Sequence, residues 1–195
     1  MLKTAGFPDV ASMAGGIKAW QGLVSAGPPE AGMAFFTAAA DAGELIALAW
    51  LLEDGSRRFY AAAAQTPSAP EAAGLFGALV KAEEQHKNTL QALYREATGR
   101  EAGPGFPKGL AVAQDGEDRM EGGVKVSEAL AWARGKGTRD LLELSMALET
   151  DSYDLYIKMS RIVPGEHARK VFRRLVAEEK EHLKRMAELI DSIPV

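Results

Sequence analysis

The chain of 195 residues contains no cysteine. This excludes disulfides, thiolate zinc sites, cysteine-ligated iron–sulfur clusters and a cysteine nucleophile. Long apolar runs are also missing, since the longest, Leu45 to Leu52, is far shorter than the roughly 20 residues that a membrane-spanning helix needs. The first twenty residues lack the basic and then apolar pattern of a secretory signal. We therefore expect a soluble, cytoplasmic protein that does not contact a membrane.

The 27 acidic and 23 basic residues give a net charge of −4. Neither acidic nor basic residues cluster in one continuous segment of the sequence. A nucleic acid is therefore not an expected partner. Few residues are β-branched, whereas Ala, Leu, Glu, Lys and Arg are abundant, and this composition favours an all-α fold. The length suits one domain of ordinary size with a small appendage.

Glycine and proline divide the chain into segments. Residues 1–29 end in Gly-Pro-Pro, so we expect a separate N-terminal segment there and a helical domain over residues 30–195. Asp41 and Glu44 have the spacing of a helix N-cap and its capping-box acid. Apolar periodicity then predicts four long helices and one short helix, over about 41–64, 71–98, 138–162, 166–192 and 126–134.

An internal repeat relates the two halves of the helical part. Glu53, Ser56 and Tyr60 of the first predicted helix recur 96 residues later as Glu149, Ser152 and Tyr156. The second and fourth helices repeat at the same offset, with matching positions Phe76, Leu79, Glu83, His86 and Leu93, and Phe172, Leu175, Glu179, His182 and Leu189. Two helical hairpins of one design, joined by a long crossover over about 99–137, predict a ferritin-like four-helix bundle.

Six repeated polar residues fall on the apolar stripes of the four helices: Glu53, Glu83, His86, Glu149, Glu179 and His182. Four buried carboxylates need a counter-charge, because unpaired buried charge costs several kcal/mol or more. No lysine or arginine lies on the stripes at that level, whereas two divalent cations would balance four carboxylates. The oxygen-rich set with two nitrogens suits iron or manganese. We therefore predict a dinuclear centre bound by these six residues.

The remaining polar residues near the stripes receive less specific interpretations. Tyr60 and Tyr156 either fill the core or act beside the centre, by hydrogen bonding a carboxylate or carrying a radical. Glu84, Glu178 and Glu181 lie off the stripes and are expected to be solvated or paired with Lys87, Lys180 and Arg185. His167 follows Pro164 and Gly165 at the start of the last helix, and we expect it to be exposed.

Over roughly residues 35–195 the sequence resembles the rubrerythrin branch of the ferritin-like superfamily. The resemblance rests on Leu52-Glu53 with Tyr60, Leu148-Glu149 with Tyr156, and the segments Glu83-Glu84-Gln85-His86 and Glu178-Glu179-Lys180-Glu181-His182. It implies that Glu53 and Glu149 are terminal ligands, that Glu83 and Glu179 bridge two iron ions, and that each ion has one histidine. It also implies reduction of peroxide or oxygen, or oxidation of ferrous iron.

Two departures from that family affect the expected function. Full-length rubrerythrins contain a rubredoxin-like Cys-x-x-Cys centre, and this chain has no cysteine. Electrons are therefore expected from an external donor, either rubredoxin-like or a flavoprotein. Peroxidase-type members have a further glutamate one turn along from the third-helix ligand, where this chain has Ser152, with Asp151 off the stripe. The resemblance therefore does not imply rapid peroxide turnover.

Residues 1–24 resemble the C-terminal end of a rhodanese domain. The matching features are Gly6-Phe7, Asp9-Val10, Met13, Gly15-Gly16-Ile17 and Ala19-Trp20. Rhodaneses act through a loop cysteine, so no sulfurtransferase activity is expected of this chain.

Three functions follow from these observations. The first is a di-iron oxidoreductase that reduces peroxide or oxygen. The second is a ferroxidase, for which ferrous iron is the substrate. The third is a non-catalytic, metal-stabilised module beside a sulfur-transfer domain. For each of them we expect a homodimer.

Overall fold

The computed structural model describes residues 41–66, 72–108, 110 and 117–193. The predicted rhodanese-like segment and the boundary at residues 29–30 lie outside these residues and stay predictions. Within the described part the chain forms α2 (Ala42–Ala63), α3 (Ala73–Thr98), α5 (Val126–Ala133), α6 (Thr138–Ile162) and α7 (Glu166–Ser192), together with the short 3-10 helix η4 (Glu121–Gly123). The described residues contain no β-strand, so the predicted all-α class is confirmed.

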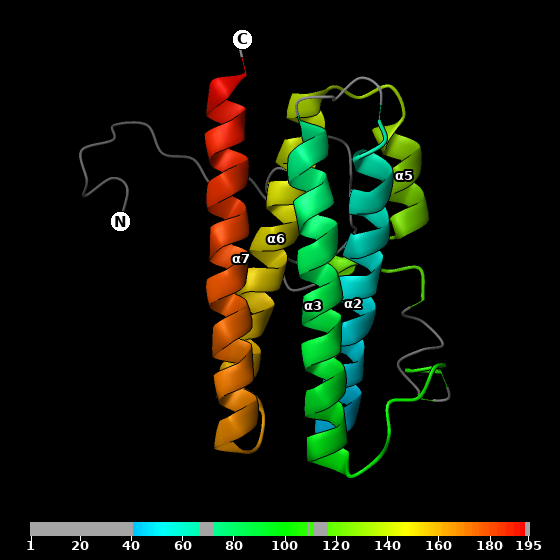
Figure 1. Cartoon of the computed structure of the whole chain (residues 1–195), viewed down its shortest axis with the longest axis vertical. Coiled ribbons are helices and arrows are strands. Elements are labelled where there is room, and N and C mark those ends of the chain that lie inside the picture. Colours follow the sequence, from blue (N-terminus) through cyan, green and yellow to red (C-terminus); the bar gives the residue numbers. More distant parts are fainter. Residues whose placement is uncertain (1–40, 67–71, 109, 111–116, 194–195) are drawn as a thin grey trace, which may run out of the picture.

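The four long helices form two antiparallel hairpins, α2 with α3 and α6 with α7, that lie side by side (Figure 1). The crossover from α3 to α6 carries η4 and α5, and α5 packs outside the bundle against α2. This arrangement of two hairpins and one long connection is the predicted ferritin-like bundle. None of the described helices combines the length and apolarity that a membrane crossing requires.

The helix ends follow from local chemistry. The Asp41 side chain accepts a hydrogen bond of 2.8 Å from the backbone N–H of Glu44, which satisfies one of the free donors at the start of α2. At the end of α3, Gly99 adopts a left-handed conformation with φ 67°, which glycine reaches without steric cost. Pro164 and Gly165 then separate α6 from α7. The boundaries predicted for the last two helices are confirmed.

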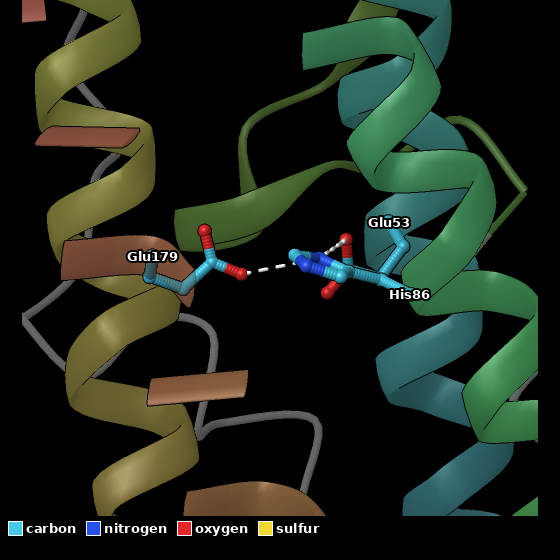
Figure 2. A group of neighbouring side chains, drawn as sticks. All are labelled: Glu53, His86 and Glu179. Atoms are coloured by element: carbon cyan, nitrogen blue, oxygen red, sulfur yellow. Dashed lines mark hydrogen bonds and ion pairs between the residues drawn. The ribbon is translucent and has the colours of Figure 1, made fainter. Parts of the chain in front are cut away.

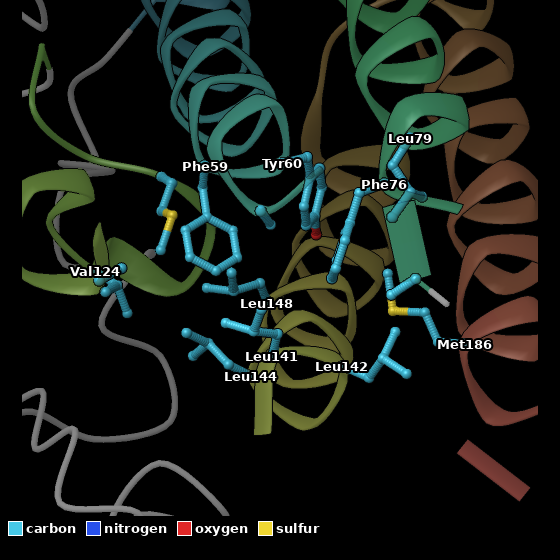
Figure 3. Close-up of a cluster of buried hydrophobic side chains, with 14 of the residues drawn as sticks. Phe59, Tyr60, Phe76, Leu79, Val124, Leu141, Leu142, Leu144, Leu148 and Met186 are labelled. Atoms are coloured by element: carbon cyan, nitrogen blue, oxygen red, sulfur yellow. The ribbon is translucent and has the colours of Figure 1, made fainter. Parts of the chain in front are cut away.

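Two apolar clusters fill the bundle at different levels. One contains Phe59, Tyr60, Phe76, Leu148 and Met186, and Figure 3 shows these side chains converging from four helices. The other contains Leu52, Leu90, Tyr156, Phe172 and their neighbours. The clusters are related by the sequence repeat, because Tyr60 contacts Phe76 as Tyr156 contacts Phe172. The level between them is occupied by the polar residues.

Gly55 lies in the interior of α2, where glycine costs roughly 0.5–1 kcal/mol relative to alanine. The reason is the crossover, since a Cβ at this position would lie 2.1 Å from the carbonyl oxygen of Arg119. The missing side chain therefore lets the residues before η4 pack directly against the helix backbone.

Gly55→Ala should lower the free energy of unfolding by about 1–3 kcal/mol, because the backbone of the crossover must move away. Urea unfolding measures the change. Gly77→Ala is the matched control, since nothing lies within 4 Å of a Cβ there and alanine should stabilise α3 slightly. Equal effects of the two substitutions would contradict this account of Gly55.

Candidate metal centre

The structure brings all six predicted residues together in the middle of the bundle. Glu53 comes from α2, Glu83 and His86 from α3, Glu149 from α6, and Glu179 and His182 from α7. Each of the four carboxylates is fully buried, and the histidines are nearly so. The periodicity of the four helices therefore placed the inward-facing residues correctly.

The six residues divide into two groups, each with ligand atoms within 4.8 Å of one another that could hold a metal ion. One group is Glu53, His86 and Glu179, and the other is Glu83, Glu149 and His182. Figure 2 shows the first group, in which Glu179 reaches across from α7 to the Glu53–His86 pair. Each histidine is thus grouped with one glutamate of its own hairpin and one of the other. Because Glu83 and Glu179 each reach the ligand group of the other hairpin, their positions suit carboxylates that bridge two ions.

The contacts repeat in the two halves. His86 Nδ1 lies 3.2 Å from Glu53 Oε2, and His182 Nδ1 lies 3.0 Å from Glu149 Oε2. The two imidazole rings stack with their centroids 5.6 Å apart. The Nδ1 atoms of both histidines therefore point at the carboxylates, and the Nε2 atom of His86 points away from them toward Glu178.

Each tyrosine reaches the carboxylate of the opposite hairpin. Tyr60 donates a hydrogen bond of 2.5 Å to Glu149 Oε1, and Tyr156 donates one to Glu53 Oε1. Both phenols are fully buried. Of the interpretations left open for these residues, the geometry displays two, packing in the apolar clusters and hydrogen bonding to a carboxylate. The hydrogen bonding fixes the orientation of Glu149 and Glu53.

The buried acids are not equally ionised. Burial tends to raise the pKa of Glu53 and Glu149, but the histidine facing each carboxylate and the hydrogen bonds that it accepts lower the pKa overall, to about 2 for Glu149. Burial and the charge of a neighbouring glutamate raise the pKa of Glu83 and Glu179 well above 4.5. Without metal Glu83 and Glu179 therefore hold protons while Glu53 and Glu149 are anions.

Several carboxylate oxygens lack a hydrogen-bond donor, which tests whether the site fits a cation. Both oxygens of Glu83 and Oε1 of Glu179 are buried without a hydrogen bond. His86 Nδ1 lies 3.3 Å from one oxygen of each residue. A buried polar group without a partner costs about 1–3 kcal/mol, and a divalent cation would satisfy all three oxygens. The donor set therefore fits a metal.

Glu178 was expected to be solvated or paired with a basic residue, but it also contacts a histidine of the centre. Its carboxylate lies 3.0 Å from Nε2 of His86 and also accepts a hydrogen bond of 2.8 Å from Arg174. The contact with His86 lowers the pKa of Glu178 to about 2. An ionised carboxylate on Nε2 directs Nδ1 of His86 toward the centre, as is usual for histidines that bind metals. The repeat position is Ala82, so His182 has no such partner there.

The positions expected for Glu84, Glu181 and His167 are confirmed. Glu84 is half exposed and pairs with Lys87 at 3.1 Å, and Glu181 is exposed. His167 is exposed, at 61 %, and contacts Glu96.

Glu121 was not predicted from the sequence. It lies in η4 with 1 % of its surface exposed, beside the centre. Its Oε2 accepts a hydrogen bond of 2.7 Å from Ser56 and its Oε1 one of 2.9 Å from Ser152. Its ligand atom lies within 4.8 Å of those of Glu53 and Glu83. Two features of the sequence could have indicated a buried partner here. They are the repeated serines Ser56 and Ser152, which lie on the apolar stripes, and the glycine pair that follows Glu121.

A surface cleft of about 550 Å³ opens between α3 and α7 above the two histidines. Glu178, Glu181 and Arg174 line its rim. Both histidines line the cleft, and the His182 side chain, at 8 % exposed, is more accessible than that of His86, at 2 %.

Comparison with protein families identifies the second hairpin. Residues 140–194 match the family model of rubrerythrin. The C-terminal hairpin is thus similar to the rubrerythrin family. The match covers nearly all of α6 and α7 and includes Glu149, Glu179 and His182. The predicted resemblance to the rubrerythrin and ferritin-like proteins is thereby confirmed over residues 140–194. Searches of curated proteins and of solved structures gave no match.

The first hairpin shares the rubrerythrin pattern through the internal repeat. Glu53, Glu83 and His86 occupy the positions of Glu149, Glu179 and His182 at the common offset, and the structure gives them equivalent contacts. A rubrerythrin domain suggests binding of iron at the clustered carboxylates and histidines.

Proposed function

We propose that the bundle binds two iron ions and acts as a rubrerythrin-like oxidoreductase that reduces peroxide or oxygen with electrons from a separate donor. The observation that carries the proposal is the pair of mirrored groups, each with two buried glutamates and one histidine. Two divalent cations would balance the four carboxylates of Glu53, Glu83, Glu149 and Glu179. Manganese is compatible with the same donor set.

Glu53 and His86 would hold one ion, and Glu149 and His182 the other, with Glu83 and Glu179 shared between them. A pair of ferrous ions supplies the two electrons that cleavage of an O–O bond requires. The protein would contribute the positions of the ligands, because Tyr60 and Tyr156 fix the terminal carboxylates and Glu178 fixes His86. The apolar clusters on either side would keep water from most of the site.

The cleft between α3 and α7 would admit a small substrate such as hydrogen peroxide. Its basic residues, Lys81, Arg174 and Arg185, would also favour an acidic surface on an electron donor. A rubredoxin-like protein or a flavoprotein remains the donor that we expect, because the chain itself contains no cysteine.

We predict that the ferrous protein is oxidised by peroxide at least as fast as by oxygen, and that it turns over only with an added electron donor. Stopped-flow mixing of the anaerobic ferrous protein with each oxidant measures the two rates. Peroxide consumption under excess substrate, with and without a reduced donor, measures turnover.

A clear preference for oxygen, together with mineral accumulating under excess ferrous iron, would favour the ferroxidase alternative. A protein that binds two ions but reacts with neither oxidant would favour the metal-stabilised module. Either outcome would contradict the oxidoreductase proposal and support one of the two alternative functions.

A further inference from the structure

The crossover places an additional carboxylate at the centre. Glu121 belongs to η4, which packs against α2 and α6, and its side chain is buried between Ser56 and Ser152. The two serines stand at equivalent positions of the repeat, three residues after Glu53 and Glu149. One carboxylate therefore receives a hydroxyl from each half of the bundle, one on each oxygen.

The surroundings of Glu121 are built to bring it inward. Gly55 allows the backbone at Arg119 to approach α2, and Met120 is fully buried. Gly122 and Gly123 then both have positive φ, at 66° and 70°, which turns the chain sharply away after Glu121. The local sequence thus directs the carboxylate into the bundle and turns the chain immediately after it.

A purely structural connection would not need a carboxylate here. An amide could hydrogen bond both hydroxyls, accepting from one serine and donating to the other, whereas an acid adds a fifth carboxyl group to a core that already contains four. Within reach beyond the serines is Glu83, whose two oxygens are buried without a hydrogen-bond donor. Glu121, Glu53 and Glu83 offer oxygens within 4.8 Å of one another. Oxygens that share a hard cation at about 2.1 Å lie at most about 4.2 Å apart, so only a small movement is required.

We infer that Glu121 is a fifth carboxylate ligand of the metal centre, supplied by the crossover to the ion that Glu53 binds. The inference rests on the proposed dinuclear site. It makes the two ions inequivalent, because the described residues contain no equivalent carboxylate beside Glu149. Ser56 and Ser152 are positioning residues that hold Glu121 in reach of the ion.

The test is a titration of the metal-free full chain with Co²⁺, followed by calorimetry and by the visible absorption of the bound ion. The wild type should bind two equivalents. Glu121→Gln should bind one of the two at least about tenfold more weakly, with a changed cobalt spectrum, because one ion loses an anionic ligand. Gln has nearly the same shape and still accepts from a serine, so the fold should be retained, and far-UV circular dichroism checks this.

Glu128→Gln is the matched control. It removes one negative charge from the same crossover, but Glu128 is exposed and pairs with Lys125 on the surface. Its two cobalt affinities and its spectrum should equal those of the wild type.

Wild-type affinities and an unchanged spectrum in a folded Glu121→Gln variant would overturn the inference, leaving Glu121 as a structural connection and the dinuclear centre intact. Failure of the wild type itself to bind two equivalents would instead overturn the proposed function, and the assignment of Glu121 with it. The two failures are thus distinguished within one experiment.

Discussion

Glu83→Ala and Glu179→Ala should each remove most of the bound metal. Both residues are fully buried, and each is grouped with a glutamate and a histidine of the other hairpin. Each also lies close to the histidine of its own hairpin, at 3.3 Å for Glu83 and 3.0 Å for Glu179. A carboxylate that bridges two ions contributes to both, so its loss weakens both sites together.

The measurement is the metal content after equilibration with a slight excess of ferrous iron under anaerobic conditions, read by elemental analysis. We expect less than half of the wild-type content in either variant. Thermal melting gives a second measure, since a ligand present at a thousandfold excess over its Kd stabilises the folded state by about 4 kcal/mol. That stabilisation should disappear in both variants.

Glu84→Ala and Glu181→Ala are the controls. They remove a carboxylate next to Glu83 and two residues after Glu179, from side chains that face solvent. Both should keep the full metal content. If Glu83→Ala or Glu179→Ala also kept it, the six predicted residues would not be the ligand set.

The helices and the six central residues were accessible from sequence because they depend on local rules. Cap residues such as Asp41, the break at Pro164 and Gly165, and the 3–4 residue spacing of apolar positions determine a helix and its buried face without reference to other parts of the chain. The repeat then supplied the long-range information, since two equivalent hairpins must place Glu53 and Glu149 at one level.

The tyrosines show where local rules stop being sufficient. Periodicity places Tyr60 and Tyr156 on the buried faces, as observed. It does not determine their partners, because each phenol reaches the hairpin that follows or precedes its own. Only the relative position of the two hairpins adds hydrogen bonding to core filling.

Glu121 and Glu178 were missed for a related reason. Glu121 lies in a connection without helical periodicity, so nothing in its own segment assigns it an inward direction. Glu178 faces away from the stripe of its own helix and contacts His86 of a neighbouring helix. In both cases the residue contacts a different helix, and helical periodicity gives no information about contacts between helices.

Metal-free protein should become less stable as the pH rises from 5 to 8. Burial, together with the charge of neighbouring glutamates, raises the pKa of Glu83, Glu121 and Glu179 well above the ordinary 4.5. In the unfolded chain these groups lose their protons near pH 4.5, whereas in the folded chain they keep them. The stability that they contribute is therefore complete below about pH 4.5 and is lost as the pH rises, by about 1.4 kcal/mol per pH unit for each group that stays protonated.

The other titrating groups at the centre do not reverse this trend. Burial lowers the pKa of His86, but Glu53 and Glu178 outweigh this effect and raise it to about 12. Its contribution is therefore present below pH 6.5 and is lost above it, in the same direction as the carboxyl groups. Glu53 and Glu149 have lowered pKa values, so their contribution is complete above about pH 4.5 and is lost only in acid.

Urea unfolding of chelator-treated protein at pH 5, 6, 7 and 8 measures this dependence. Glu83→Gln should reduce the slope by about 1.4 kcal/mol per pH unit, because one proton fewer is retained on folding. Loading with metal should reverse the sign of the dependence, since cations displace protons from the carboxylates and bind more tightly as the pH rises. A flat profile in the metal-free protein, or an unchanged slope in Glu83→Gln, would show that the acids at the centre are not held protonated by burial.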